Sequence, residues 1–538
     1  MATGMRGARS AGSPDAVVIG AGHNGLVAAN TLVDAGWNVV VLEACEHPGG
    51  AIWSDESVRA GFVTDLYSAF YPLGVASPVI DALELPRYGL SWLRAPAVLA
   101  HIFPDDQCAM LHADVADTAA SLEQFAPGDA AAWSELFAEY QEIRDPLLAA
   151  LFRPFPPVRG ALRLARALHV AGALRFARFA VQPVRRFGQE RFSGAGGPIL
   201  LAGNALHADL PPEGSGSALY GWLLAMLGQD FGFPVPEGGS RRIVEALTAR
   251  LLSHGGTLRV CTPVEQVIIE GDQAVGVRLA DGQMIRCRRG VLADTSAPAL
   301  YRSLVGEEHL PQRLVRDLEN FQWDAHTLKV NWALSAPIPW IAEQARAAGT
   351  VHLGVDMDGL TDYAAALATR AVPRRPFLLL GQMTTTDPTR SPPGTESAWC
   401  YTHLPENSKL NVGEITDHVE RIERIIDRHA PGFRDLILDR SVQSPEDLQA
   451  ADANLVGGAI GGGTANLHQQ LVFRPIPGLS RAETVVDRLY LASSSAHPGG
   501  GVHGGPGHNA ALAALSREAL TGPARRRVVR FALERIYR

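Results

Sequence analysis

The chain has 538 residues, of which 46% are apolar and 19% are charged, and its formal net charge is −8 at pH 7. This length exceeds one simple hydrophobic core and predicts two or three domains of ordinary globular composition. The negative charge gives no reason to expect a nucleic acid partner, and no apolar run approaches the ~18 residues that a membrane span requires.

The five cysteines are scattered and form no CxxC pair, which argues against a zinc site and a disulfide framework. A cytoplasmic, reducing compartment fits this cysteine usage. The first 14 residues lack the apolar stretch of a secretory signal peptide. No metal-ligand spacing, paired carboxylates or nucleophile elbow stand out, so we expect no metal site.

The first predicted unit is a strand, a glycine-rich turn, a helix and a second strand. The apolar run Ala16–Ile19 predicts a buried parallel strand, Leu26–Ala35 a helix and Asn38–Leu42 a second buried strand. The turn has GxGxxG spacing with two polar residues inside it: Gly20, Gly22, His23, Asn24 and Gly25.

Each part of this unit suits dinucleotide binding. Gly20 makes the tight turn, Gly22 lets the backbone approach a pyrophosphate, and Gly25 lets helix and strand pack closely. The helix N-terminus favours phosphate, and Glu43, at the end of the second strand, can accept hydrogen bonds from a ribose hydroxyl. The alternative is a glycine turn in an unrelated α/β unit.

The middle of the chain carries a basic segment. Between Pro146 and Gln189 there is no Asp or Glu, and eight arginines alternate with apolar residues at roughly helical spacing. Such a segment can lie on an anionic membrane surface, and the alternative is a solvated helical face. We expect the region from 76 to 234 to be mostly helical.

A second stretch predicts a return to the nucleotide-binding sheet. A helix is expected over Arg241–His254, followed by short strands with a hairpin turn at Asp281 and Gly282. Gly290–Ala293 is expected to rejoin the central sheet. From 300 to 478, strands alternate with a helix: Thr327–Leu334, Phe377–Gln382, Ser397–His403 and the helix Glu414–Arg428.

The third informative stretch lies near the C-terminus. A strand at Leu489–Ser493 precedes the glycine-rich loop His497–Gly507, and a helix follows over Asn509–Leu520. We interpret this stretch as a strand, a loop that exposes its backbone, and a helix whose N-terminus points at a ligand.

Together these three stretches resemble the flavin amine oxidase superfamily, and within it the phytoene-desaturase-like branch. That branch includes carotenoid desaturases, carotenoid ketolases and the pyridine nucleotide-disulphide oxidoreductase domain-containing proteins. The resemblance covers nearly the whole chain. It implies an α/β fold with a Rossmann-type (GR2-like) FAD-binding core, an inserted α+β substrate domain and a helical, basic segment.

The resemblance also implies the domain organisation. The FAD-binding domain is expected to be discontinuous, over residues 1–75, 236–300 and 480–522. The substrate domain is expected over 76–235 and 301–479, with 146–190 as the basic helical segment. Residues 523–538 are expected to form a basic C-terminal tail.

FAD is the cofactor that the resemblance implies. Glu43 followed by Gly49 and Gly50 belongs to FAD-binding versions of the unit, and Ala51 stands where the family usually has Arg. Val264 is similar to the position whose backbone meets the adenine. His497–Val502 is similar to the motif that lies against the isoalloxazine ring. The expected FAD-binding residues are Gly20, Gly22, His23, Asn24, Gly25, Glu43, Gly49, Gly50, Ala51, Val264, Gly500, Gly501 and Val502.

A further segment is similar to the ketolase-like members. Gln469, Arg474 and Pro475 fit their pattern, whereas Gly462 and His468 stand where the family commonly has His and Asp. A disulfide reductase is not expected, because only Cys45 follows the first unit and no second nucleotide domain is visible.

Two residues are candidates for catalysis. Only two of the 48 basic residues are lysines, and one of them, Lys329, lies inside an apolar strand. The family resemblance implies a lysine on a comparable strand near the flavin; the alternative is an exposed strand position. His503 follows the glycine motif and could act as a base or cap the next helix. Weaker candidates for the substrate region are His207, Asp209, Tyr67, Phe70 and Tyr71.

We therefore predict an FAD-dependent oxidoreductase that takes hydride from an apolar, isoprenoid or lipid-like substrate. Oxygen or a quinone would reoxidise the flavin. The alternatives are an FAD-dependent amine oxidase and a non-catalytic flavoprotein that acts as an interaction module. The expected partners are an apolar small molecule and, in the membrane interpretation, a bilayer surface. Oligomeric state stays open, with a dimer among the options.

Overall fold

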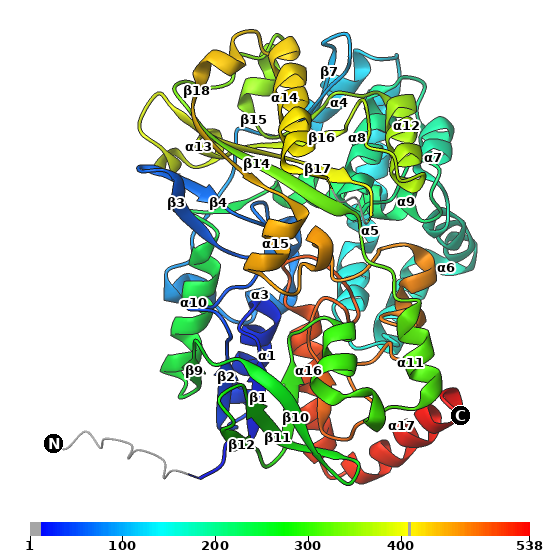
Figure 1. Ribbon diagram of the computed structural model, residues 1–538. Coiled ribbons are helices and arrows are strands. Elements are labelled where there is room, and N and C mark those ends of the chain that lie inside the picture. The colour runs from blue at the N-terminus through cyan, green and yellow to red at the C-terminus, as the bar shows by residue number, and fades with distance from the viewer. Residues whose placement is uncertain (1–11, 407–409) are drawn as a thin grey trace, which may run out of the picture.

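A computed structural model describes residues 12–406 and 410–538, and it divides the molecule around two sheets. Figure 1 shows a five-stranded sheet in the lower half and a seven-stranded sheet in the upper half. We call these parts the five-stranded half and the seven-stranded half. This arrangement confirms the predicted α/β fold with a parallel sheet core.

The five-stranded sheet is wholly parallel, in the order β19-β13-β1-β2-β9. Its strands are β1 (Ala16–Ile19), β2 (Val39–Leu42), β9 (Thr257–Arg259), β13 (Gly290–Ala293) and β19 (Leu489–Leu491). They come from three separate stretches of the chain, and all of their carboxyl ends meet at one edge. The exact domain boundaries stay a prediction.

Three helices cover this sheet: α1 (His23–Asp34), α10 (Arg241–Ser253) and α16 (Gly505–Glu518). Both α1 and α16 begin earlier than expected from the sequence. Gly22 has an extended backbone and serves as the N-cap of α1, and Gly504, with φ of +69°, serves as the N-cap of α16. Both helices therefore start at the glycine loops themselves, which brings their N-terminal amides to the carboxyl edge of the sheet.

The predicted hairpin is part of a three-stranded antiparallel sheet beside the five-stranded sheet. Its strands are β10 (Val264–Glu270), β11 (Gln273–Leu279) and β12 (Met284–Arg286). Two helices, the short η3 (Ala299–Val305) and α11 (Gln312–Glu319), pack beside them. Their apolar side chains share one core with one face of the five-stranded sheet.

The seven-stranded sheet is mixed, in the order β18-β14-β17-β16-β15-β6-β7. Its strands are β6 (Ala97–Ile102), β7 (Cys108–Leu111), β14 (His326–Leu334), β15 (Ala348–Leu353), β16 (Leu378–Gln382), β17 (Glu396–Leu404) and β18 (Ile437–Gln443). Helix α14 (Val412–His429) packs on one face, where Val330 and Trp332 meet Ile422. The short strands are β3 (Ser54–Arg59), β4 (Phe62–Asp65), β5 (Trp92–Leu93) and β8 (Val235–Pro236).

The expectation that 76–234 is mostly helical is wrong for residues 92–111. All six residues of β6 are buried, and β6 pairs in parallel with β15 from a distant part of the chain. A strand buried on both faces has no alternation of apolar and polar residues, so the sequence pattern did not reveal it.

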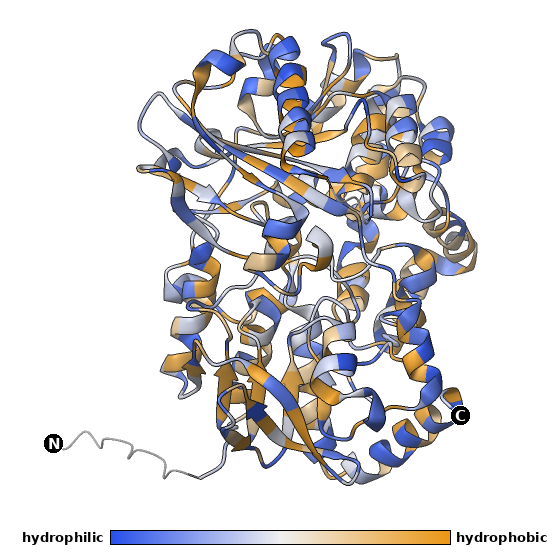
Figure 2. Ribbon diagram, in the orientation of Figure 1, coloured by the Kyte–Doolittle hydropathy of each residue, from blue (hydrophilic) through white to orange (hydrophobic). Residues whose placement is uncertain are grey.

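The remaining helices surround the two sheets. They are α2 (Pro72–Ala76), α3 (Pro78–Asp81), α4 (Val115–Glu123), α5 (Asp129–Leu151), α6 (Val158–Ala180), α7 (Val184–Arg191), α8 (Gly196–Ala205), α9 (Ser217–Phe231), α12 (Met357–Ala368), α13 (Met383–Thr386) and α15 (Pro445–Ala451). Figure 2 shows that apolar residues concentrate on the strands of the five-stranded sheet. Helix α6, which falls inside the predicted basic segment, lies at the edge of the molecule beside the junction of the two halves (Figure 1).

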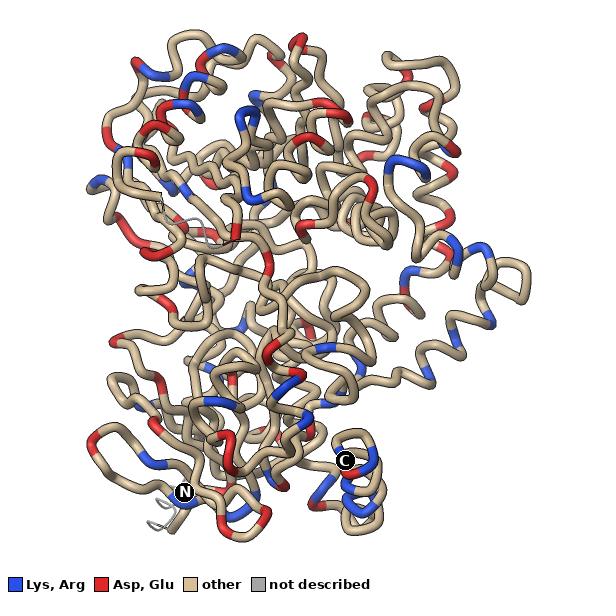
Figure 3. Tube along the Cα trace, turned by 45° about the vertical axis from the view of Figure 1, so that its right-hand side comes forward, with Lys and Arg blue, Asp and Glu red and all other residues tan. Residues whose placement is uncertain are grey.

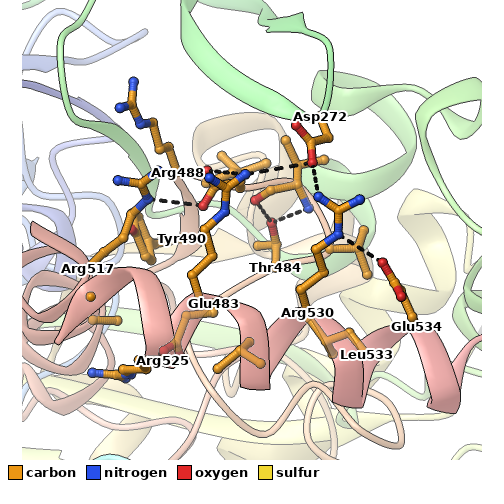
Figure 4. A pocket seen from close by; sticks show the side chains of 18 of the residues that line it. Asp272, Glu483, Thr484, Arg488, Tyr490, Arg517, Arg525, Arg530, Leu533 and Glu534 are labelled. Atoms are coloured by element: carbon orange, nitrogen blue, oxygen red, sulfur yellow. Dashed lines mark hydrogen bonds and ion pairs between the residues drawn. The ribbon is translucent and has the colours of Figure 1, made fainter.

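The predicted basic C-terminal tail is a helix, α17 (Gly522–Ile536), that packs on the five-stranded half. Three of its five arginines pair with acidic residues: Arg525 with Glu483, Arg526 with Asp487 and Arg530 with Asp272. Figure 4 shows Arg530 between Asp272 and Glu534. A cavity of about 240 Å³ lies between α17 and β19, and its charged groups are largely matched in ion pairs.

Candidate functional site

The GxGxxG turn joins β1 to α1 at the carboxyl edge of the five-stranded sheet. Gly20 has φ of +88°, a conformation that side chains other than glycine rarely adopt. A Cβ at Gly25 would lie 2.2 Å from the Gly20 carbonyl oxygen, so only glycine allows this approach of helix and strand. Gly49 donates its N–H to the Ala21 carbonyl at 3.0 Å, and its segment lies beside Gly22. The turn with Gly20, Gly22 and Gly25 and the segment with Gly49 and Gly50 thus form one backbone surface, which we call the glycine cradle.

Glu43 lies at the end of β2, next to the glycine turn. Its carboxylate accepts the Ala21 N–H at 2.7 Å through Oε2 and the Cys45 N–H at 2.9 Å through Oε1. These two hydrogen bonds hold the carboxylate in one orientation, and each oxygen keeps a further lone pair for a ribose hydroxyl. The predicted position of Glu43 beside the turn is what the structure shows.

Val264, the expected adenine contact, lies just after the segment that pairs with the end of β2. Val264 begins β10, where it pairs with Leu279. The residue whose backbone meets the end of β2 is Thr262, which donates its N–H to the Glu43 carbonyl at 2.7 Å. The contact of Val264 with adenine stays a prediction.

Two carboxylates at this edge were missed by sequence reasoning. Asp294 directly follows β13 and accepts the Gly25 N–H at 2.8 Å, and burial raises the pKa of its carboxyl to about 7. Asp452, after α15, lies next to Gly50; burial raises its pKa and the Glu43 carboxylate raises it further. The position of Asp294 at the end of a strand parallel to β1 was a signal that could have found it. A protonated Asp294 lets the site accept a diphosphate without repulsion.

The C-terminal glycine motif lies directly against the N-terminal unit. His23, in the first turn of α1, places Nε2 3.2 Å from the Gly501 carbonyl oxygen, and Asn24 donates to the Ser494 hydroxyl at 3.4 Å. A Cβ at Gly74 would lie 3.0 Å from the Val502 carbonyl oxygen. Gly500 lies against the Gly461 carbonyl in the same way. The two stretches predicted to form opposite ends of one ligand site are therefore in contact.

His503 closes the C-terminal motif through both of its ring nitrogens. Nδ1 accepts the Gly505 N–H at 3.1 Å, and Nε2 lies 3.3 Å from the Gly500 carbonyl oxygen. Burial, and to a smaller extent His23, lowers the pKa of this imidazole to about 3. With both nitrogens bonded inside the loop, this geometry supports helix capping rather than base catalysis, and the catalytic assignment stays a prediction.

Lys329 connects the two halves. On β14, its side chain is 3% exposed, and Nζ donates to the carbonyl of Tyr67 at 3.0 Å and to that of Asp65. The ammonium also lies over the Trp399 ring, 5.2 Å from its centroid. Burial lowers the pKa of Lys329 to about 7, and Asp65 opposes part of this shift. Lys329 is therefore a buried group with two backbone partners, not an exposed strand residue.

Lys329 is linked to the glycine cradle through Tyr67 and the residue after it, Ser68. Ser68 follows Tyr67 and donates its hydroxyl to the Ala51 carbonyl at 2.8 Å. Ala51 follows Gly49 and Gly50, so the lysine steadies the segment that ends the cradle. The predicted distance of Lys329 from the flavin stays untested.

The aromatic candidates Tyr67, Phe70 and Tyr71 lie between Lys329 and the glycine cradle. Phe70 contacts Trp399 with ring centroids 6.0 Å apart, and the Tyr71 hydroxyl donates to the Ser68 carbonyl at 2.8 Å. Tyr71 is buried beneath the cradle, whereas Phe70 belongs to a small apolar cluster between the two halves. Tyr67 contributes its backbone carbonyl to Lys329, as described above.

His207 and Asp209 belong to a buried polar cluster under β15 and β17. His207 Nε2 lies 2.9 Å from His352 Nε2, and Asp209 pairs with His403 at 2.8 Å. Burial lowers the pKa of His403, but the Asp209 carboxylate outweighs this effect and leaves it raised. His403 therefore holds its proton more tightly than an ordinary imidazole does. Within the described residues, no group of three or more His, Cys, Asp or Glu is arranged to hold a metal ion.

A comparison with known protein families identifies the family of this chain. A family model described as flavin-containing amine oxidoreductase matches residues 25–396. The chain belongs to this family.

Similar proteins confirm the resemblance seen in the sequence. This flavin-containing oxidoreductase is 30% identical to pyridine nucleotide-disulfide oxidoreductase domain-containing protein 2 of Rattus norvegicus, over 92% of each chain. It is 26% identical to the lycopene-forming phytoene desaturase of Pseudescherichia vulneris, over 94% of this chain and 99% of that enzyme. A solved structure of a putrescine oxidase double mutant has a TM-score of 0.60 at 16% identity, and covers 94% of this chain and 99% of that chain. This last likeness shows the fold.

FAD is the cofactor of this oxidoreductase, and the residues present fit it. The glycine cradle presents backbone amides and carries no side chain that would fill the diphosphate position. Neither α1 nor α16 has an acidic residue of its own in its first turn, and the acidic group at the N-terminus of α1 is the Asp294 carboxyl described above. Glu43 would hold the ribose, Gly22 and Gly49 the diphosphate, and Gly500 to Val502 the ring.

We expect Asp294 to make FAD retention depend on pH. Its pKa of about 7 in the folded protein exceeds the ~3.9 of an unfolded chain. The stability that its protonation contributes is present below pH ~3.9 and is lost as pH rises through about 7. The variant Asp294→Asn keeps an oxygen acceptor for the Gly25 N–H and removes the titration.

The test compares FAD release and melting temperature of wild type and Asp294→Asn between pH 5 and pH 9. Near pH 9 the wild type should lose FAD faster than the variant and should melt several degrees lower than the variant does. The exposed Asp362, changed to Asn, serves as control and should follow the wild type. Parallel curves for wild type and Asp294→Asn would contradict the assignment.

A second prediction concerns Lys329 and oxygen. An ammonium beside the reduced flavin would stabilise the negative charge that oxygen acquires as it takes electrons. Lys329→Met should therefore slow aerobic reoxidation about tenfold or more, or ~1.4 kcal/mol in barrier. In the wild type this rate should fall as pH rises through about 7, where Lys329 loses its proton. Stopped-flow absorbance measures the rate, and an unchanged rate in a folded, FAD-loaded variant would refute the role.

Proposed function

We propose that this protein is an FAD-dependent dehydrogenase or desaturase that acts on an apolar, isoprenoid or lipid-like substrate, with oxygen or a quinone as the electron acceptor. The observation that carries the proposal is the nearly full-length similarity to phytoene desaturases, including that of Pseudescherichia vulneris. Bound FAD supplies the hydride acceptor. The chain itself supplies the surface that holds the substrate and the groups around the flavin.

The surface between the two halves supports an apolar substrate. Trp399 and Tyr401 project from β17 on the same face as Lys329, with ring centroids 5.9 Å apart. Phe70 and Val235 pack against this face from the five-stranded half. Large aromatic surfaces of this kind suit a hydrocarbon chain with double bonds.

Besides Lys329, a histidine adjoins this aromatic surface. The His403 ring lies 5.5 Å from that of Tyr401 and carries the ion pair with Asp209. A substrate that is apolar along most of its length but bears one hydroxyl or carbonyl fits this arrangement better than a pure hydrocarbon does.

We expect anaerobic addition of a lipid extract to bleach the flavin absorbance, and mass spectrometry to find a product two mass units lighter than its parent. A double bond formed by hydride and proton removal has this mass change. The same assay with short aliphatic amines and polyamines tests the amine oxidase alternative. Bleaching by amines alone would refute the proposal. Full FAD content with no bleaching in either panel would favour a non-catalytic flavoprotein.

Helix α6 supports access to a lipid-like substrate from a membrane surface. Val158, Leu162, Arg166, Arg159 and Arg163 span roughly 140° of the helix circumference at 100° per residue, and all are exposed. The opposite side, with Leu164 and Leu168, packs against the core of the seven-stranded half. The helix is therefore amphipathic, with an outer face that is both apolar and basic.

The charge on this outer face is uncompensated. Four arginines lie near the exposed apolar residues: Arg159, Arg163, Arg166 and Arg175. None of them forms an ion pair with a described residue. The helix breaks at His169, which has φ of +53°, and Val170 and Leu174 beyond the break are 82% and 72% exposed. Figure 3 shows this part of the chain standing out from the body of the molecule, with basic residues along it.

We propose that this face of α6 docks on an anionic bilayer. Free arginines beside exposed aliphatic side chains match acidic headgroups beside acyl chains, and each arginine near such a surface contributes ~1 kcal/mol. Among the helices of residues 12–406 and 410–538, none combines the length and apolar character that crossing a bilayer requires.

Vesicle sedimentation tests the docking face. The protein should bind vesicles with 30% phosphatidylserine and not pure phosphatidylcholine vesicles. The double variant Arg159→Glu, Arg163→Glu should weaken binding about 30-fold or more, since two favourable charges become repulsive. The matched control reverses the exposed Arg424 and Arg428 on α14 and should bind as the wild type does. Equal weakening by both pairs would show a non-specific charge effect and contradict the proposal.

A further inference from the structure

The five cysteines fall into two groups. Cys108, Cys287 and Cys400 are buried, and burial raises the pKa of each thiol, to about 12 for Cys108 and about 11 for Cys287. Cys45 and Cys261 are exposed. Because the thiolate is the reactive form and needs access to solvent, chemistry at sulfur is expected at these two residues.

The two exposed cysteines meet at the carboxyl edge of the five-stranded sheet. Cys45 follows β2 and Cys261 follows the neighbouring parallel strand β9. The Cys261 N–H donates to the Cys45 carbonyl at 2.9 Å. Two further backbone hydrogen bonds join the same two segments, one between Glu43 and Arg259 and one between Glu43 and Thr262. Hydrogen-bonded neighbouring strands lie about 4.8 Å apart, and disulfides join Cα atoms about 4.4–6.8 Å apart, so the hydrogen bond between the two cysteines is compatible with a disulfide between them.

The surroundings of the two thiols set their order of reaction. Burial and the Glu43 carboxylate raise the pKa of Cys45 more strongly than Cys261 does. A raised pKa makes the Cys45 thiolate scarcer, so we assign the second step of the oxidation to Cys45.

We propose that Cys45 and Cys261 form an oxidation site in which hydrogen peroxide joins them by a disulfide bond. The Cys261 thiolate attacks one peroxide oxygen, the O–O bond breaks, and hydroxide leaves and takes up a proton as water. The product is a sulfenic acid at Cys261. The Cys45 sulfur then attacks the Cys261 sulfur, the S–O bond breaks and a second water leaves. Two thiols and one peroxide thus yield one disulfide and two waters, and a thiol reductant reverses the change.

The position of this site links it to the cofactor. The Cys45 N–H is one of the two donors that hold the Glu43 carboxylate, and Glu43 is the residue expected to hold the ribose. A bond between the segments after β2 and β9 restrains the movement of Glu43 away from the site. FAD should therefore dissociate more slowly from the oxidised protein. This inference does not depend on which substrate the enzyme oxidises.

The experiment uses the full-length protein loaded with FAD. It is treated with increasing hydrogen peroxide, blocked with iodoacetamide in denaturant and digested without reductant. We expect one cross-linked peptide pair containing Cys45 and Cys261, with two thiols lost per chain. Cys45→Ser and Cys261→Ser should each abolish this pair, and Cys400→Ser, a matched change at a buried thiol, should keep it.

Two results would overturn the inference. One is oxidation of Cys45 or Cys261 to sulfinic or sulfonic acid with no cross-link between them at any peroxide concentration. The other concerns the cofactor: FAD release after dilution, followed by flavin fluorescence, should slow severalfold on oxidation and recover with dithiothreitol. Equal release rates for the cross-linked and reduced proteins would refute the restraint on Glu43.

Discussion

The close approach of α1 and α16 is the constraint on which the site depends. A Cβ at Gly507 would lie 1.9 Å from the Asn24 carbonyl oxygen, so these helices touch only because this residue is glycine. The contact brings the first turn of α1 beside the start of α16, although the two helices come from opposite ends of the chain. Both helix N-termini consequently face one volume, and their partial positive charges add there. The diphosphate and the flavin ring need this shared environment.

Buried charges fix the loop that backs the flavin motif. Arg474, which is 2% exposed, donates to the carbonyls of Ser494, Gly461 and Thr464. From the other side, the Asp324 carboxylate accepts N–H groups of the same loop, including that of Gly461 at 2.6 Å. Gly461 in turn lies against Gly500. Removal of either side chain would leave buried backbone groups of this loop without hydrogen-bond partners, at a cost of about 1–3 kcal/mol for each such group. The fit of Arg474 to the family pattern thus has a structural reason.

Local patterns made the nucleotide-binding unit predictable, because its strand, turn and acidic residue lie within one short stretch. The FAD assignment needed Glu43 and the distant glycine motif together, and the structure shows them at one edge. Strand β6 was not predictable in this way, since its only signal is burial against β15, far away in sequence. Asp452 was likewise hidden, because no local pattern relates the end of α15 to the glycine cradle. For His503, sequence left open which partners its ring would have, and only the folded loop decides this.

The order of strands in the five-stranded sheet also governs how the protein is made. Strands β1 and β2 leave the ribosome first, but β9 and β13 follow only after residue 256, and β19 ends at Leu491. The seven-stranded sheet, whose strands all lie between 97 and 443, can close before β19 has been synthesised. Strand β1 therefore gains its partner β13 only after Ala293 has been made, and β13 gains β19 only after Leu491, so part of this sheet stays unpaired for much of translation, a situation in which nascent chains depend on chaperones. A truncation that removes only the last 50 residues would leave the cofactor sheet without its edge strand, however intact the rest of the fold.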